Sequence, residues 1–201
     1  MITTIIFDIG NVLADFDWRK HFADFGYDDG MVERIAKATV KSLLWNEVDR
    51  GVMGQEELVD KFVANDPEIE QDIRKVLAYV GTMVTRSDYA IPWIQDLKSK
   101  GYRTLYLSNF SEKAETDCVK ALDFIPYMDG GIFSYQEKII KPMPEIYQLL
   151  IDRYQLVPEE CVFMDDTLAN LTGAEKFGIH TIHFINKEQA VSELRKLGVD
   201  A

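Results

Sequence analysis

Residues 3–12 read TTIIFDIGNV, and this stretch decides the fold. It is apolar and rich in β-branched side chains up to Phe7, and it then meets Asp8 and, two positions later, Gly10. A short run of this kind that stops at turn residues is typical of a strand buried on both faces of a sheet. We therefore predict a strand over residues 3–7, with Asp8 at its carboxyl end.

The periodicity of the following residues divides the chain into two parts. From about residue 17 to about residue 84 the pattern is helical, with charged faces and glycine breaks. From residue 91 onward predicted helices alternate with predicted strands at 104–108, 132–135, 161–164 and 179–184. Such alternation predicts a parallel sheet covered by helices. We expect an α/β protein with a doubly wound core of residues 1–16 and 87–201, into which a small helical domain of residues 17–86 is inserted.

Composition limits the partners. The chain has 201 residues and a formal net charge of -12, and no basic run offsets that charge. Nucleic acid and anionic membrane surfaces are therefore excluded as expected partners. No window approaches the roughly 18 apolar residues of a membrane span, and neither a leader pattern nor a disulfide framework is visible, so we expect a cytoplasmic protein that acts on a small molecule.

Polar residues gather at the predicted strand ends. The carboxyl ends of parallel strands share one edge of the sheet, where α/β proteins bind their ligands, so distant residues can converge there. Three aspartates at one edge repel each other unless a cation compensates them, and oxygen ligands favour Mg²⁺. Lys141, in a loop, adds a positive charge suited to an anionic phosphate group. The converging residues are Asp8, Ser108, Asn109, Lys141, Asp165 and Asp166.

Four segments carry a family resemblance. FDIGNV at 7–12, LSNF at 107–110, the Lys141 and Pro142 pair, and FMDDTLAN at 163–170 resemble the four ordered motifs of the haloacid dehalogenase-like superfamily. The resemblance covers nearly the whole chain. It implies a magnesium-dependent phosphatase in which the helical segment forms a cap over the active site.

The resemblance also implies a role for each site residue. Asp8 would be the nucleophile that is transiently phosphorylated, and Lys141 would orient it and the phosphoryl group. Ser108 and Asn109 would bind the phosphoryl group. The metal ligands would be Asp8, Asp166 and the main-chain carbonyl of Gly10, with Asp165 acting through a coordinated water. Arg50, in a cap segment that faces the active site in related proteins, is a candidate substrate contact, with a surface salt bridge as the alternative.

Gly10 departs from the family pattern. Many of its phosphatases carry an aspartate at this position as general acid and base, which glycine cannot replace. General acid catalysis is worth roughly 100- to 10,000-fold. We therefore expect substrates with easily departing leaving groups, such as anomeric sugar, acyl or aryl phosphates. DIGNVLADFD at 8–17 resembles a branch that includes a bacterial glucose 1-phosphate phosphatase with the same glycine. Asp15 or Asp17 could alternatively supply the missing acid.

Two other functions remain open. A 2-haloacid dehalogenase shares the fold and nucleophile but needs no metal, and the paired Asp165 and Asp166 argue against it. A catalytically silent protein could bind a phosphometabolite or a partner through the same cleft, and Gly10 is the best support for this alternative. The sequence leaves the oligomeric state open between monomer and homodimer.

Overall fold

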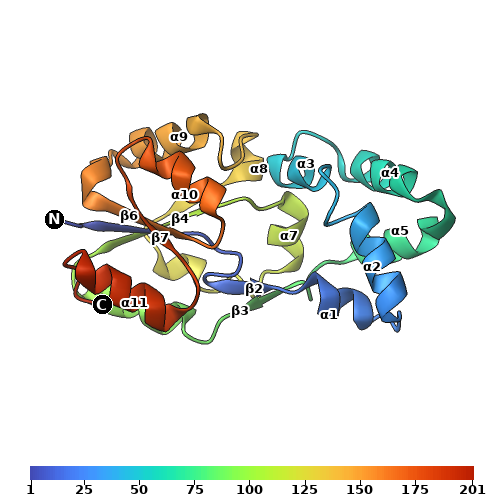
Figure 1. The fold of residues 1–201 in the computed structure, drawn as a ribbon, viewed down its shortest axis with the longest axis horizontal. Helices are drawn as coiled ribbons and strands as arrows, with labels where there is room; N and C mark the ends of the chain where they lie inside the picture. Colours follow the sequence, from blue (N-terminus) through green and yellow to red (C-terminus); the bar gives the residue numbers. More distant parts are fainter.

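The computed structural model describes residues 1–201 as an α/β protein built around a five-stranded parallel sheet (Figure 1). The strand order is β5-β4-β1-β6-β7, so the first strand lies in the middle of the sheet. The predicted doubly wound core is confirmed. The strands are β1 (Thr4–Phe7), β4 (Arg103–Ser108), β5 (Gly131–Phe133), β6 (Cys161–Asp165) and β7 (His180–His183).

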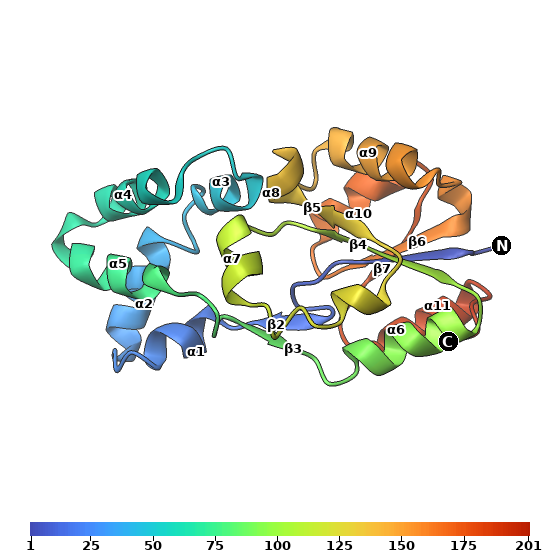
Figure 2. The ribbon, with the colours of Figure 1, turned by 180° about the vertical axis from the view of Figure 1, so that it is seen from behind.

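Helices cover both faces of the sheet because successive side chains of a buried strand point to opposite sides. Phe7 packs edge-on against Trp93 at 5.2 Å between ring centroids, on the face of α6 and α11. Ile6 lies in a second apolar cluster with Tyr147, on the face of α9 and α10. Figures 1 and 2 show these two helix layers on either side of the strands. The core helices are α6 (Ala90–Ser99), α7 (Glu112–Asp117), α8 (Ser134–Glu137), α9 (Pro144–Tyr154), α10 (Leu168–Glu175) and α11 (Lys187–Lys196).

A helical cap region follows β1 in the sequence and extends away from the sheet (Figure 2). Two short antiparallel strands, β2 (Ala14–Phe16) and β3 (Val84–Arg86), lead the chain into and out of it. The division of domains at residues 16/17 and 86/87 stays a prediction. The helices between these strands are α1 (Trp18–Ala23), α2 (Asp29–Ala38), α3 (Trp45–Arg50), α4 (Gln55–Asn65) and α5 (Glu70–Ala78).

The structure corrects two details of the predicted elements. The helix expected over residues 111–122 is the shorter α7, and turns follow it up to residue 124. The β2–β3 pair was not expected, because three-residue strands carry too little periodicity to be seen in a sequence. No helix combines the length and apolar character needed to cross a membrane.

The close approach of β5 to β4 requires a glycine at position 131. A Cβ atom on Gly131 would lie 2.5 Å from the backbone oxygen of Tyr106 and 2.3 Å from its ring. Overpacking costs about 1–3 kcal/mol, which lowers the Tm of a chain of this size by roughly 2–12 °C. We predict a loss in this range for Gly131→Ala, measured by thermal unfolding.

Gly54→Ala is the matched control, since a Cβ atom there meets nothing within 4 Å and its φ of -66° suits alanine. Equal Tm values for the two variants would contradict the packing of β5 on β4.

Candidate functional site

The site lies at the carboxyl edge of the sheet, where the register of the central strands places it. Phe7 pairs with Tyr106 of β4 and with Met164 of β6. The residues that follow these positions therefore lie next to one another. Asp8, the end of β4 and Asp165 converge as the sequence predicted, and Lys141 reaches them from the loop between α8 and α9.

Lys141 is a buried cation held between two carboxylates. Its Nζ lies 2.9 Å from Oδ1 of Asp8 and 2.7 Å from Oδ2 of Asp165, and only 2% of the residue is exposed. Burial alone lowers the pKa of a lysine, but the charges of Asp8 and Asp165 outweigh it and raise the pKa of Lys141 above its usual value. Lys141 therefore stays protonated and presents a fixed positive charge at the site.

Asp8 is buried at this edge, with 8% of the residue exposed. Burial raises the pKa of Asp8 to about 6, and the nearby charge of Asp165 acts in the same direction. Lys141 and hydrogen bonding from Ser108 oppose this rise. Ser108 is itself 1% exposed at the end of β4. A carboxyl group with this pKa ionises readily near neutral pH and is directed at the cavity that it lines.

The donor set fits a hard divalent cation. Carboxylate oxygens of Asp8, Asp165 and Asp166 all lie within 4.8 Å of one another, and one lysine cannot neutralise three carboxylates. Oxygen atoms are the ligands that Mg²⁺ prefers. Gly10 lines the same cavity. The structure therefore brings together the acidic residues that the sequence predicted as metal ligands.

The two adjacent aspartates are held differently. Both oxygens of Asp165 accept hydrogen bonds, from the Thr167 amide at 2.7 Å, from Lys141 Nζ, and from Asn170 Nδ2 at 3.1 and 3.0 Å. Asp165 is fully buried, whereas Asp166 is partly exposed. Asp166 accepts from Asn11 Nδ2 at 2.8 Å and from the Thr167 hydroxyl at 3.2 Å. Of the two, Asp166 has the carboxylate that is freer to face the cavity.

Asn109 anchors the loop that carries Lys141. Its Oδ1 accepts from the Lys141 amide at 2.7 Å, and its Nδ2 donates to the Lys141 carbonyl at 3.0 Å. Asn109 also lines the cavity, so its remaining N–H can still meet a ligand. The residue predicted as a phosphate contact thus also positions the lysine.

A cavity of about 510 Å³ connects this edge to the cap. Arg50, the predicted substrate contact, does not line it. Its guanidinium faces Glu47 at 3.3 Å and Met143, and its buried Nε has no hydrogen-bond partner.

Neither Asp15 nor Asp17 lines the cavity, and Asp17 instead caps α1 by accepting from the Lys20 amide. These two residues are therefore not placed to supply an acid.

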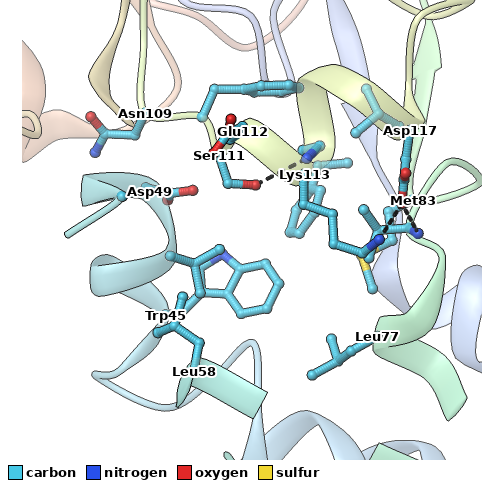
Figure 3. A pocket seen from close by; sticks show the side chains of 18 of the residues that line it. Trp45, Asp49, Leu58, Leu77, Met83, Asn109, Ser111, Glu112, Lys113 and Asp117 are labelled. Carbon is cyan, nitrogen blue, oxygen red and sulfur yellow. Dashed lines mark hydrogen bonds and ion pairs between the residues drawn. The ribbon is translucent and has the colours of Figure 1, made fainter. Parts of the chain in front are cut away.

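Asp49, on α3, was missed by the sequence analysis. Its side chain is directed from the cap into the cavity (Figure 3). Burial raises the pKa of Asp49 to about 7, with a further contribution from the charge of Asp8. Nothing in the local sequence distinguishes it from other helical aspartates, since its environment arises only when the cap meets the core.

Asn11 was also missed, although its sequence carried a signal. It adopts a φ of 56°, in the left-handed region that asparagine tolerates better than most residues. This turn lets Asn11 bridge the loop after β1 and Asp166. An asparagine directly after Gly10 could have indicated such a turn.

Two enzymes are examples of proteins that are similar to this chain in sequence. (S)-2-haloacid dehalogenase 4A of Burkholderia cepacia is 35% identical over 95 residues, which cover 47% of this chain and 41% of that protein. D-ribitol-5-phosphate phosphatase of Bacteroides thetaiotaomicron is 26% identical over 200 residues, covering 90% and 91%. The chain spans less than half the length of the first curated relatives that it matches, because the matched segment covers from 10% to 41% of those proteins.

Solved structures share the fold. A haloacid dehalogenase-family enzyme from Bacteroides thetaiotaomicron, crystallised with magnesium and inorganic phosphate, superposes with a TM-score of 0.71 at 20% identity, covering 90% of this chain and 93% of that one. At this identity the likeness shows the fold alone. The family model for haloacid dehalogenase-like hydrolases matches residues 2–178. The chain therefore belongs to the haloacid dehalogenase-like hydrolases.

Proposed function

We propose that this hydrolase is a magnesium-dependent phosphomonoesterase that works through a phosphorylated Asp8. The observation that carries the proposal is the buried Lys141 between Asp8 and Asp165, beside a cluster of three carboxylates. A nucleophile, a fixed cation and an acidic metal site at one edge of the sheet are the parts that phosphoryl transfer requires. The proposed substrate is a small sugar phosphate or another phosphometabolite, which the phosphatase relatives support.

The reaction proceeds in two displacements. An Asp8 carboxylate oxygen attacks phosphorus, and the bond to the ester oxygen breaks, so that the alcohol oxygen leaves with the bonding electron pair and takes up a proton. Water then attacks the phosphorus of the aspartyl phosphate, loses a proton, and releases inorganic phosphate and the free carboxylate. Lys141, which already contacts Asp8, holds the nucleophile and offsets the charge of the phosphoryl oxygens.

The metal site is assigned to Asp8, Asp166 and the carbonyl of Gly10. Asp165 is assigned a contact through water, supported by its full burial and by its position outside the lining of the cavity. When bound, Mg²⁺ supplies charge stabilisation for the transferring phosphoryl group. Ser108 and Asn109 are assigned to the remaining phosphoryl oxygens.

The first test removes the nucleophile. We expect the wild-type protein to release phosphate from p-nitrophenyl phosphate only when Mg²⁺ is present. Asp8→Asn should lower kcat at least about 1,000-fold, because an amide cannot form the acyl phosphate. Asp88→Asn, a matched change at an exposed residue, should retain full activity.

Two outcomes would redirect the assignment. Metal-independent halide release from 2-chloropropionate would favour a dehalogenase. A protein that binds phosphate but turns over neither compound would be the silent binding protein.

The second test concerns the leaving group, since Gly10 cannot donate a proton. We expect kcat/KM to fall roughly 100-fold or more from p-nitrophenyl phosphate to phenyl phosphate, in steady-state assays. Gly10→Asp should flatten this dependence and Gly10→Ala should not; a Cβ atom at Gly10 meets nothing within 4 Å, so neither substitution clashes at that atom. A flat dependence in the wild-type protein would contradict the expectation and identify another proton donor, with Asp49 the cavity's carboxyl suited to that role.

The third test uses the raised pKa of Asp8, about 6 in the metal-free protein. Below this pH the carboxyl group holds a proton that Mg²⁺ must displace. We therefore expect the apparent affinity for Mg²⁺ to fall up to about tenfold per pH unit below about pH 6 and to level off above it. Titration calorimetry would measure this dependence. An affinity that is constant between about pH 5 and about pH 7 would contradict the role of a carboxyl group with this raised pKa as a metal ligand.

A further inference from the structure

The cavity that begins at Asp8 is polar at one end and apolar beyond it. At the sheet edge it is lined by Asp8, Asn109, Asp166 and their neighbours. Away from this edge its walls are mainly hydrophobic, and Figure 3 shows Trp45 and Leu58 of the cap, with Leu77 and Met83, around the same space. An organic group attached to a phosphate at Asp8 would have to occupy this apolar part.

The apolar wall is built by the cap helices and the connecting strands. Trp45 comes from α3, Leu58 and Phe62 come from α4, and Leu77 comes from α5. Trp45 packs between Phe62 and Phe16 of β2, with ring centroids 5.9 and 6.2 Å away. The wall is thus a continuous packed surface of the cap rather than a set of isolated apolar side chains.

Most polar side chains opposite this wall, on α7, already have partners, and the exception is the exposed Glu112. Ser111 accepts a hydrogen bond from the Ala114 amide at 3.1 Å, and Thr116 donates to the Glu112 carbonyl at 2.9 Å. Lys113 pairs with Asp117 at 2.9 Å, and Asp117 also accepts from the Val80 amide. These polar groups therefore offer little to the hydroxyl groups of a ligand.

We propose that this cavity selects aryl and acyl phosphates, and other phosphates whose organic group is apolar, over the phosphates of sugars and polyols. The inference rests on the proposed function for the phosphate end of the ligand. It departs from the sugar phosphate named there and favours a phosphometabolite with an apolar organic group. The cavity's volume of about 510 Å³ lies in the range of sites for drug-sized ligands.

The physical reason is the balance of burial and hydrogen bonding. Each methylene group buried against the wall raises affinity about fourfold. A buried hydroxyl group without a partner lowers affinity roughly 5- to 150-fold. A polyol chain buries less apolar surface and leaves hydroxyl groups without partners, so we expect it to bind more weakly than an alkyl chain of the same length.

The first experiment measures binding without turnover. Titration calorimetry of the wild-type protein with Mg²⁺ would compare methyl-, butyl- and hexylphosphonate, which cannot be hydrolysed. We expect affinity to rise about fourfold per added methylene group. Equal affinities for the three phosphonates would overturn the inference, whether or not the protein is a phosphatase.

The second experiment compares hexyl phosphate with sorbitol 6-phosphate, which have the same number of carbon atoms and differ mainly in hydroxyl groups. We expect kcat/KM to favour hexyl phosphate by about 100-fold or more. A preference for sorbitol 6-phosphate would overturn the substrate class while confirming phosphatase activity. If neither compound releases phosphate, the phosphonate series alone decides the class. The proposed function fails only if p-nitrophenyl phosphate is not hydrolysed either.

A pair of variants tests whether the cap wall binds the organic group of the ligand. Leu58→Asn places a polar side chain in the wall and should reduce the affinity ratio of hexyl- to methylphosphonate about tenfold. Leu43→Asn makes the same change at an exposed cap residue and should leave the ratio unaltered. Thermal unfolding would verify that both variants fold. If Leu58→Asn folds and its affinity ratio is unaltered, the cap wall does not bind the organic group of the ligand. If that variant does not fold, the wild-type phosphonate series decides.

Discussion

The ion pairs of Lys141 with Asp8 and Asp165 are the constraint on which the site depends. An isolated buried charge would cost several kcal/mol, so the three groups are stable only as a set. Each must therefore reach one point from a different part of the chain: β1, β6 and the loop before α9. The parallel register brings the two strands there, and Asn109 fixes the loop through its two hydrogen bonds to the Lys141 backbone. Fold and site thus stabilise each other.

The sequence predicted the parts of the site that depend on strand ends. Asp8 and Asp165 follow apolar runs whose ends must share an edge in any parallel sheet, and the structure confirms their convergence. Lys141 lies in a loop, and its role came from the family resemblance. The placement of Asp49 and Arg50 could not be predicted, because adjacent positions on a short helix point in different directions and only the docking of the cap decides which faces the cavity.

Core and cap contribute different chemistry to one cavity. The core supplies charged groups whose positions are fixed by the sheet, at the end where a phosphate would bind. The cap supplies Asp49 and a mostly apolar wall. Side chains of the cap can change without disturbing the ion pairs of the core, since the cap joins the core in sequence only through β2 and β3. The apolar wall of the cap and the charged groups of the core are in this way separable properties of the molecule.

Gly10 lies at a position that evolution could change without altering the fold. Its backbone is not in the left-handed region, and a side chain there would enter open space. The glycine is therefore not required by the fold, and a single-base change converts a glycine codon into one for aspartate or glutamate. Descendants of this protein could gain a proton donor beside Asp8 in one mutational step, without first acquiring a compensating change elsewhere. The loop after β1 is thus a point where the range of hydrolysable esters can widen or narrow while the fold stays the same.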